Sequence, residues 1–186
     1  KSIKELLADA KANPKKITLA VTQIGGPDTM CAGMVEKAAG VQFNNVVFNG
    51  QSESNAALLG GHVDMAIGNP GESIELSKAG KVRILGVFSE KRMADAPEIP
   101  TMKEQGLNVV FSQNRGLCAP AGIPADAKKV LEEALFKYTK TEIFKKYCSD
   151  NMLTVAFMDG AAFEKYLKEW EAKYAVILKE MNLIKK

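Results

Sequence analysis

Three short polar turns carry the side chains that could do chemistry in this chain. They span residues 22–29, 49–53 and 68–72, and each follows an apolar, strand-forming run and precedes an expected helix. Their Thr, Gln, Ser, Asn, Asp, Glu and Gly residues suit hydrogen bonding to a small polar solute and include no nucleophile–base pair. The glycines would let backbone amides approach a ligand, and the helix N-termini favour an anion. We therefore expect these turns to bind a small polar solute.

The candidate ligand contacts share a hydroxyl, an amide, a charge or the absence of a side chain. They are Thr22, Gln23, Gly25, Gly26, Asp28, Thr29, Gly50, Gln51, Ser52, Gly68, Asn69, Asn114 and Arg115. Asp28 and Thr29 could instead only cap the helix that follows them, and Ser52 and Glu53 have the same alternative. Arg115 could clamp a carboxylate through its planar guanidinium or form a structural ion pair.

Acidic residues near the turns bear on both the ligand and the chance of catalysis. Glu53 and Glu72 would repel a dicarboxylate unless they cap helices or hold water molecules. An enzyme would have to draw its acid, base or nucleophile from Asp28, Glu53 and Glu72, and would consume its ligand. We expect no enzyme and assign no catalytic residue.

The cysteines and the one histidine do not form a metal or redox motif. Cys31, Cys118 and Cys148 are odd in number and far apart, so we expect buried free thiols. His62 precedes a buried strand, at the opposite end from the turns. We therefore expect no metal and no cofactor.

The turns are positioned by repeated strand–turn–helix units, which predict a parallel sheet with its turns gathered at one edge. Ligands of open α/β sheets bind at that edge. The expected strands cover residues 17–22, 46–48, 63–67, 82–88, 108–111 and 116–120, with an isolated strand at 153–156. The expected helices cover residues 2–12, 30–39, 56–59, 73–78, 102–105, 125–138, 142–149 and 161–181, the last three with apolar stripes that we expect to be buried.

Composition bounds the class of protein. The 186 residues are 46% hydrophobic and 25% charged, as in a soluble globular protein of one or two domains. A net charge of +3 with dispersed basic residues argues against nucleic acid as a partner. No apolar run approaches the ~20 residues of a membrane span. The chain begins at Lys1 rather than Met, so we expect a processed or truncated product.

Six motifs in order carry a family resemblance. They are residues 1–7 with Ala12-Asn13-Pro14, Gly25-Gly26, residues 56–64, residues 78–83, residues 100–106, and residues 114–120 with Gly122-Ile123-Pro124. Each motif is weak alone, but their shared order along almost the whole chain is specific. The chain resembles the substrate-binding proteins of tripartite tricarboxylate transporters, the TctC or Bug family.

The resemblance implies a periplasmic-binding-protein-like (type II) α/β fold, with two lobes around a cleft. By that analogy residues 1–114 form a three-layer αβα lobe two, and residues 115–186 are the helix-rich returning part of lobe one. The first part of lobe one, with half of the ligand site, would be missing. An isolated chain would then bind its ligand weakly or not at all, and would self-associate through residues 153–156 or its last helix.

The implied function is capture of a small organic carboxylate for the membrane components of a transporter. The implied location is periplasmic or otherwise extracytoplasmic, with a lipid anchor on a full-length precursor as one option. A ligand-sensing effector domain of a regulator is the alternative, because such domains share the two-lobe architecture. It would normally carry a DNA-binding segment, which this sequence does not show.

Overall fold

The computed structural model describes residues 2–184, which form two compact units. The first unit comprises Lys1–Ser112 with Ile177–Lys186, and the second comprises Gln113–Val176. Each is described here by itself. The assignment of residues 1–114 and 115–186 to two lobes stays a prediction.

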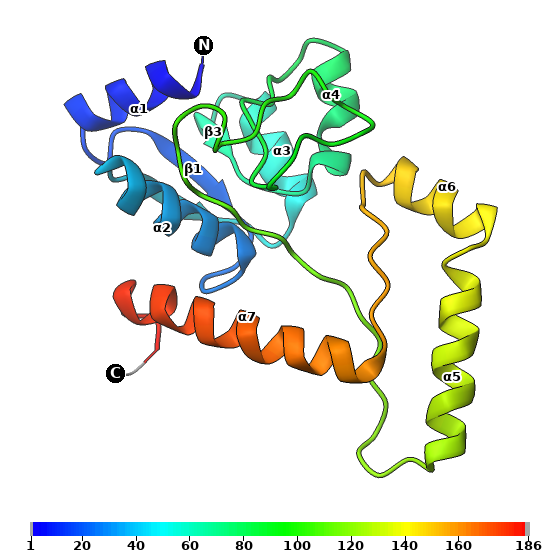
Figure 1. The fold of residues 1–186 in the computed structure, drawn as a ribbon. Helices are drawn as coiled ribbons and strands as arrows, with labels where there is room; N and C mark the ends of the chain where they lie inside the picture. Colours follow the sequence, from blue (N-terminus) through cyan, green and yellow to red (C-terminus); the bar gives the residue numbers. More distant parts are fainter. Residues whose placement is uncertain (1, 185–186) are drawn as a thin grey trace. The chain divides into compact units, whose positions relative to one another are not determined.

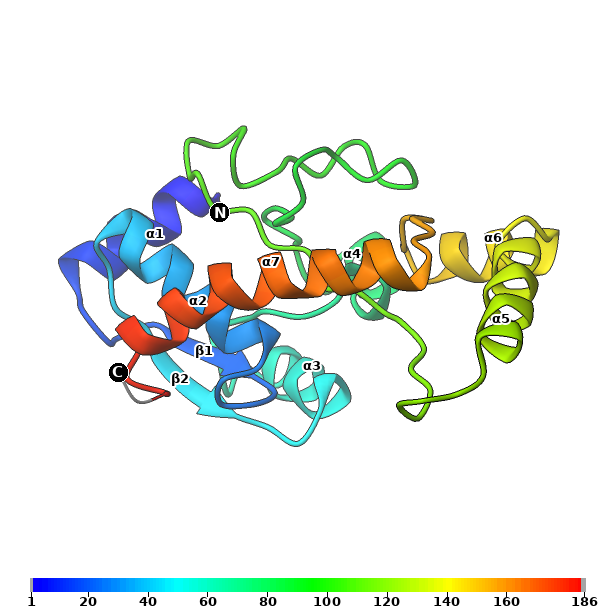
Figure 2. The ribbon, with the colours of Figure 1, turned by 60° about the horizontal axis from the view of Figure 1, so that its bottom comes forward.

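In the part of the first unit that the structure describes, a three-stranded parallel sheet has the order β2-β1-β3. Its strands are β1 (Thr18–Val21), β2 (Asn44–Val47) and β3 (Met65–Ala66). The helices are α1 (Ile3–Ala12), α2 (Pro27–Ala39), α3 (Gln51–Leu59), the 3-10 turn η1 (Pro70–Glu72) and α4 (Ile74–Lys78). Figure 1 shows β1 between α2 and α3, and Figure 2 shows β1 and β2 side by side.

Alternation along β1 builds the core on both faces of the sheet. Leu19 and Val21 point to one face, where they pack with Ala32 and Val35 of α2. Ala20 points to the other face and packs with Ala57 of α3. These packing partners place helices on both sides of the sheet, which confirms the expected three-layer α/β architecture of this unit.

Both ends of β1 are held by the same pair of residue types. Thr18 donates its backbone N–H and its hydroxyl to Oδ2 of Asp64, at 2.8 and 2.7 Å. Thr22, just past the other end, donates its N–H and hydroxyl to Oδ2 of Asp28, at 3.1 and 2.5 Å. The polar groups that flank the buried strand are thereby paired, as buried or half-buried backbone requires.

Four expected strands are absent as regular strands from the described residues. Segment 82–88 forms only an isolated parallel bridge between Val87 and Thr101, and segment 108–111 is tied by the Phe111 N–H to the Phe88 carbonyl at 2.9 Å. Segments 116–120 and 153–156 are irregular, and residues 102–105 form a turn rather than a helix. A strand-like composition is not sufficient to form a strand, because a strand is held only by a ladder of hydrogen bonds to a neighbouring strand.

The second unit contains three helices in its described residues. They are α5 (Ala125–Tyr138), α6 (Glu142–Asp150) and the part of α7 (Gly160–Glu180) up to Val176. Thr141 caps α6 by accepting from the Phe144 N–H at 3.3 Å. Asp159 accepts from the Ala162 N–H at 2.8 Å at the start of α7. Glu132 of α5 accepts from the Gly160 N–H at 2.8 Å, which joins α5 to the start of α7.

The expected burial of the stripes on α5 and α6 is wrong. Val130 and Leu131 of α5 are 65% and 51% exposed, and Ile143 of α6 is 76% exposed. The stripe of α7 is better covered, since Tyr174 is 3% exposed and its ring lies 4.4 Å from that of Trp170. Amphipathic periodicity marks a face that needs cover, but it does not supply the covering element. Among the described residues, no helix is both long enough and apolar enough to span a bilayer.

Candidate functional site

The three polar turns of the first unit lie at one edge of its sheet. All three strands run in parallel, so the turns that follow them start from the same side. The Phe48 N–H donates to the Val21 carbonyl at 2.9 Å, and the Ile67 N–H donates to the Ala20 carbonyl at 3.2 Å. The second and third turns therefore begin on either side of the end of β1.

The first turn leads into α2 with a glycine at the N-cap position rather than a capping side chain. Gly26 is the N-cap residue and Pro27 the first helical residue, and no side chain caps the helix. Asp28 and Thr29 thus lie inside the first helical turn, and the alternative that one of them caps α2 is wrong. Gly25 has a φ of +76°, a conformation that favours glycine.

Internal hydrogen bonds fix the shape of this turn. Asp28 accepts from Thr22 as described above, and the Thr29 hydroxyl donates to the Gln23 carbonyl and, at 3.3 Å, to that of Gly26. The Gly26 N–H also donates to the Gln23 carbonyl at 3.2 Å. The hydroxyl protons of both threonines are therefore committed within the turn. The Gln23 side chain is exposed.

The second turn presents the N-terminus of α3. Gly50 is the N-cap residue, and no side chain caps this helix either. Glu53 turns back and accepts from the Asn49 N–H at 3.1 Å and from Asn49 Nδ2 at 3.2 Å. Its carboxylate is thus held by hydrogen-bond donors of Asn49, and it does not cap α3. Gln51 is half-buried, and Ser52 is exposed at the start of the helix.

The third turn lies against the second turn. Asn69 Nδ2 donates to Oε1 of Glu72 at 3.3 Å, so Glu72 too is engaged. A Cβ atom added to Gly68 would lie 2.0 Å from Oε1 of Gln51. The space beside Gly68 is therefore filled by the Gln51 side chain. The short helix expected over residues 73–78 is present as α4, and the 3-10 turn η1 precedes it.

Asn114 and Arg115 belong to the second unit. Arg115 is exposed and donates from Nη1 to the hydroxyl of Tyr147 on α6 at 2.9 Å. This partner is a phenol, and the expected alternative of an ion pair would need a carboxylate. Asn114 is half-buried. The structure thus brings eleven of the thirteen candidate residues to one sheet edge of the first unit, and it describes these two in the other unit.

The described residues hold no group of three or more His, Cys, Asp and Glu side chains that could bind a metal ion. Cys31 and Cys148 are buried free thiols, but Cys118 is exposed, contrary to expectation. Burial raises the pKa of the Cys31 thiol, with a smaller contribution from the nearby Asp28 carboxylate. A raised pKa disfavours the reactive thiolate. His62 lies against Gly60, at the end of α3 away from the turns.

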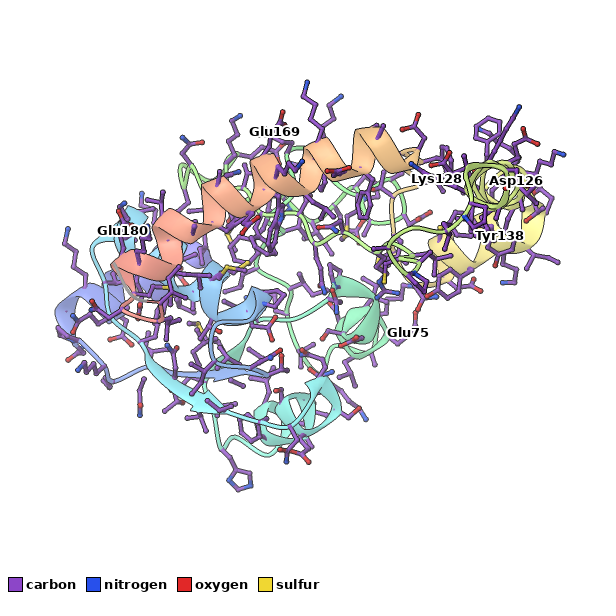
Figure 3. All side chains as sticks on the ribbon, turned by 90° about the horizontal axis from the view of Figure 1, so that it is seen from below. Glu75, Asp126, Lys128, Tyr138, Glu169 and Glu180 are labelled. Atoms are coloured by element: carbon purple, nitrogen blue, oxygen red, sulfur yellow. The ribbon has the colours of Figure 1, made fainter. Side chains whose placement is uncertain are left out.

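Two open cavities of the first unit lie away from the turns. One of about 490 Å³ is bordered by α2 and the last turn of α7, and one of about 340 Å³ by Ala10, Pro14 and Gln42. Glu180, labelled near the C-terminal end of α7 in Figure 3, lines the larger cavity. Both of its carboxylate oxygens accept from Lys37 Nζ at 2.8 Å. These cavities bring none of the candidate residues together.

Asn55 of α3 is the residue at this edge that sequence reasoning missed. Its amide accepts from Gln51 Nε2 at 3.2 Å and donates to the Glu72 carbonyl at 3.1 Å. The available signal was its spacing of four residues from Gln51, which places both side chains on one helix face.

Comparison with known proteins finds a matching family and matching folds. The sequence matches the family described as tripartite tricarboxylate transporter family receptor, TctC, over residues 1–183. A Cupriavidus necator relative, described as the UPF0065 protein in the gbd 5' region, is 32% identical over 187 residues, which cover 100% of this chain and 56% of that protein. The chain therefore spans little more than half the length of this curated relative.

Solved structures show the same fold. The structure of the periplasmic binding protein BugD has a TM-score of 0.83 and 25% identity, over 100% of this chain and 63% of that chain. The R. palustris protein Rpa4515 with adipate has a TM-score of 0.86 and 19% identity, over 96% of this chain and 60% of that chain. These likenesses confirm the periplasmic-binding-protein-like α/β fold and the resemblance drawn from the six motifs. The chain belongs to the TctC family of tripartite tricarboxylate transporter receptors.

Proposed function

We propose that this chain contributes one side of the binding site of a solute-binding protein for small organic carboxylates. The observation that carries the proposal is the pair of helix N-termini at the sheet edge. α2 and α3 both begin at a glycine, and no side chain caps either one. Free N-terminal amides and the helix dipole together favour an anion, by about 0.3–1 kcal/mol for each helix.

The acidic residues at this edge are compatible with an anionic ligand. Asp28, Glu53 and Glu72 accept hydrogen bonds from Thr22, Asn49 and Asn69 respectively. These donors compensate part of each negative charge before any ligand arrives. The repulsion expected from the sequence is thereby reduced. Rpa4515, which shares the fold, was solved with the dicarboxylate adipate, and this supports the same class of ligand here.

The partners and location follow from family membership as parts of the proposal. The family's description as a transporter receptor supports delivery of the solute to membrane components of a transporter. The likeness to the periplasmic binding protein BugD supports a periplasmic site of action. Capture without conversion is expected, because the matching family is described as a transporter receptor and BugD as a periplasmic binding protein.

The test is an NMR titration of backbone amides with adipate and with adipamide, its neutral diamide of the same length. We expect adipate to shift the amide signals of residues 24–26, 28, 29 and 50–53, and adipamide to shift them several-fold less at equal concentration. Equal or stronger binding of adipamide, or of the dication putrescine, would overturn the anion site. Conversion of adipate during the titration would show an enzyme instead.

A further inference from the structure

Asn55 lies where the second and third turns meet, and its side-chain amide connects them. Its Oδ1 accepts from Gln51 Nε2 at 3.2 Å and from the Ser73 hydroxyl at 3.3 Å. Its Nδ2 donates to the backbone carbonyl of Glu72 at 3.1 Å. One half-buried amide thus ties α3 to both ends of the junction between η1 and α4.

Gln51 extends this connection to the start of the third turn. The Cα of Gly68 lies against the Gln51 amide, because a Cβ there would be 2.0 Å from Oε1 and 2.3 Å from Cδ. Gly68 is not among the glycines with positive φ, so its backbone conformation would accept alanine. The glycine is needed for the close approach of the Gln51 side chain.

Regular secondary structure contributes little to holding the third turn. β3 pairs with β1 over only two residues, and η1 and α4 are three and five residues long. Helices this short are marginal by themselves, because nucleation costs more than a few hydrogen bonds return. Side-chain contacts from α3 therefore have a large share in fixing this turn.

We propose that Asn55, acting through Gln51, is a positioning residue that fixes the third turn against the N-terminus of α3. It sets the distance between Asn69 and the α3 amides without contacting a ligand, since its own oxygen and one amide proton are already committed. Gln51, expected from the sequence to bind the ligand, acts in this arrangement as a spacer between Asn55 and Gly68. The effect on ligand affinity rests on the proposed function, whereas the effect on the turn does not.

The first experiment measures amide hydrogen exchange across the third turn, which needs no ligand. In Asn55→Ala we expect exchange to accelerate about tenfold or more at Glu72 and Ser73, whose N–H groups donate to the Asn69 and Pro70 carbonyls, with β1 amides unchanged. Asn55→Asp keeps the acceptor but faces the Glu72 carbonyl with a carboxylate, so it should accelerate exchange as well. Asn45→Ala, an exposed amide on β2, is the matched control. Unchanged exchange in both Asn55 variants would overturn the proposal.

The second experiment is a double-mutant cycle. Gly68→Ala should accelerate exchange in the wild-type chain, but much less in a Gln51→Ala background, where the obstructing side chain is gone. Equal effects in both backgrounds would contradict the spacer role. Adipate affinity is read in parallel and should fall about tenfold in Asn55→Ala at nearly unchanged melting temperature. If the wild-type chain binds no carboxylate, the proposed function fails while the exchange data still decide the role of Asn55.

Discussion

At the scale of single residues, aspartate–threonine pairs secure β1 at both ends, and they differ in what surrounds them. The Asp28–Thr22 pair lies at the candidate site, and the Asp64–Thr18 pair lies at the opposite edge. The Thr18 hydroxyl and then the Thr18 N–H lower the pKa of the Asp64 carboxyl, because both donate to its charged form. A side chain at each end thus sets the limits of the central strand.

The Asp64 pair makes stability depend on pH. The pKa of the Asp64 carboxyl is lower in the folded chain than in the unfolded chain. The stabilisation by this pair is therefore complete above about pH 4 and is lost as the pH falls through the folded-state pKa of Asp64. We expect Asp64→Asn to cost about 1 kcal/mol at pH 7, a small figure because the site is exposed and screened, and to cost less near pH 2. Urea unfolding at the two pH values measures it, with Glu98→Gln as control. A cost that does not change with pH would show that charge is not the cause.

Arg115 offers a second residue-scale test. If its guanidinium clamps a ligand carboxylate, Arg115→Lys should weaken adipate binding several-fold with little change in stability, because lysine lacks the planar fork. Tyr147→Phe removes the observed partner at 2.9 Å and is the comparison. If Arg115→Lys and Tyr147→Phe both lower stability and leave affinity unchanged, the arginine has a structural role.

At the scale of elements, the N-terminus of α3 is the sharpest test of anion binding. Ser52 is exposed in its first turn, so a substitution there disturbs little packing. We expect Ser52→Asp to keep or slightly raise stability, because an acidic residue suits a helix N-terminus. The same charge should repel adipate and weaken binding about tenfold, or roughly 1.4 kcal/mol.

Ser52→Asn is the control for the lost hydroxyl, because asparagine has the size of aspartate but no charge. Calorimetry with adipate and thermal unfolding give the two readouts. Tighter adipate binding in Ser52→Asp than in Ser52→Asn would contradict an anion site at this helix.

The elements also show what a sequence can and cannot predict. α5 begins and ends where its periodicity and its flanking Pro124 indicate, because helix signals are local. Segment 82–88 has the composition of a strand but makes a single bridge, because pairing depends on a distant partner. Gly68 is expected from the sequence to let a ligand approach the backbone, whereas the group that lies against it in the structure is the Gln51 side chain. Asn55 was missed because a polar residue on a helix usually faces water.

At the scale of the whole molecule, the exposed apolar face of α5 and α6 predicts association. Monomeric proteins rarely expose contiguous apolar patches above a few hundred Å². Here Leu131, Tyr138 and Ile143 are 51%, 46% and 76% exposed, and the Tyr138 ring lies 5.0 Å from that of Phe144, which joins the two helices. The last helix, expected to drive association, has a better covered stripe. We therefore propose that copies of this chain pair through α5 and α6.

Sedimentation velocity at micromolar concentration tests this pairing. We expect a dimer or larger species in the wild-type chain and a shift toward monomer in Leu131→Gln and Ile143→Gln. Lys129→Gln, on the opposite side of α5, should leave the distribution unchanged. A wild-type monomer would refute pairing, and association unaffected by both apolar substitutions would place the contact elsewhere.

Because of the long helix α7, the first unit can be completed only late in the synthesis of the chain. Its last turn belongs to that unit, where Glu180 binds Lys37 across 143 residues of chain and Met181 fills the space beside Gly33. During translation the sheet and α2 leave the ribosome well before these partners are made. The surface of the first unit is therefore complete only after the second unit has been synthesised. Until then, the surface of α2 beside Gly33, which Met181 later covers, is exposed to chaperones and to other chains.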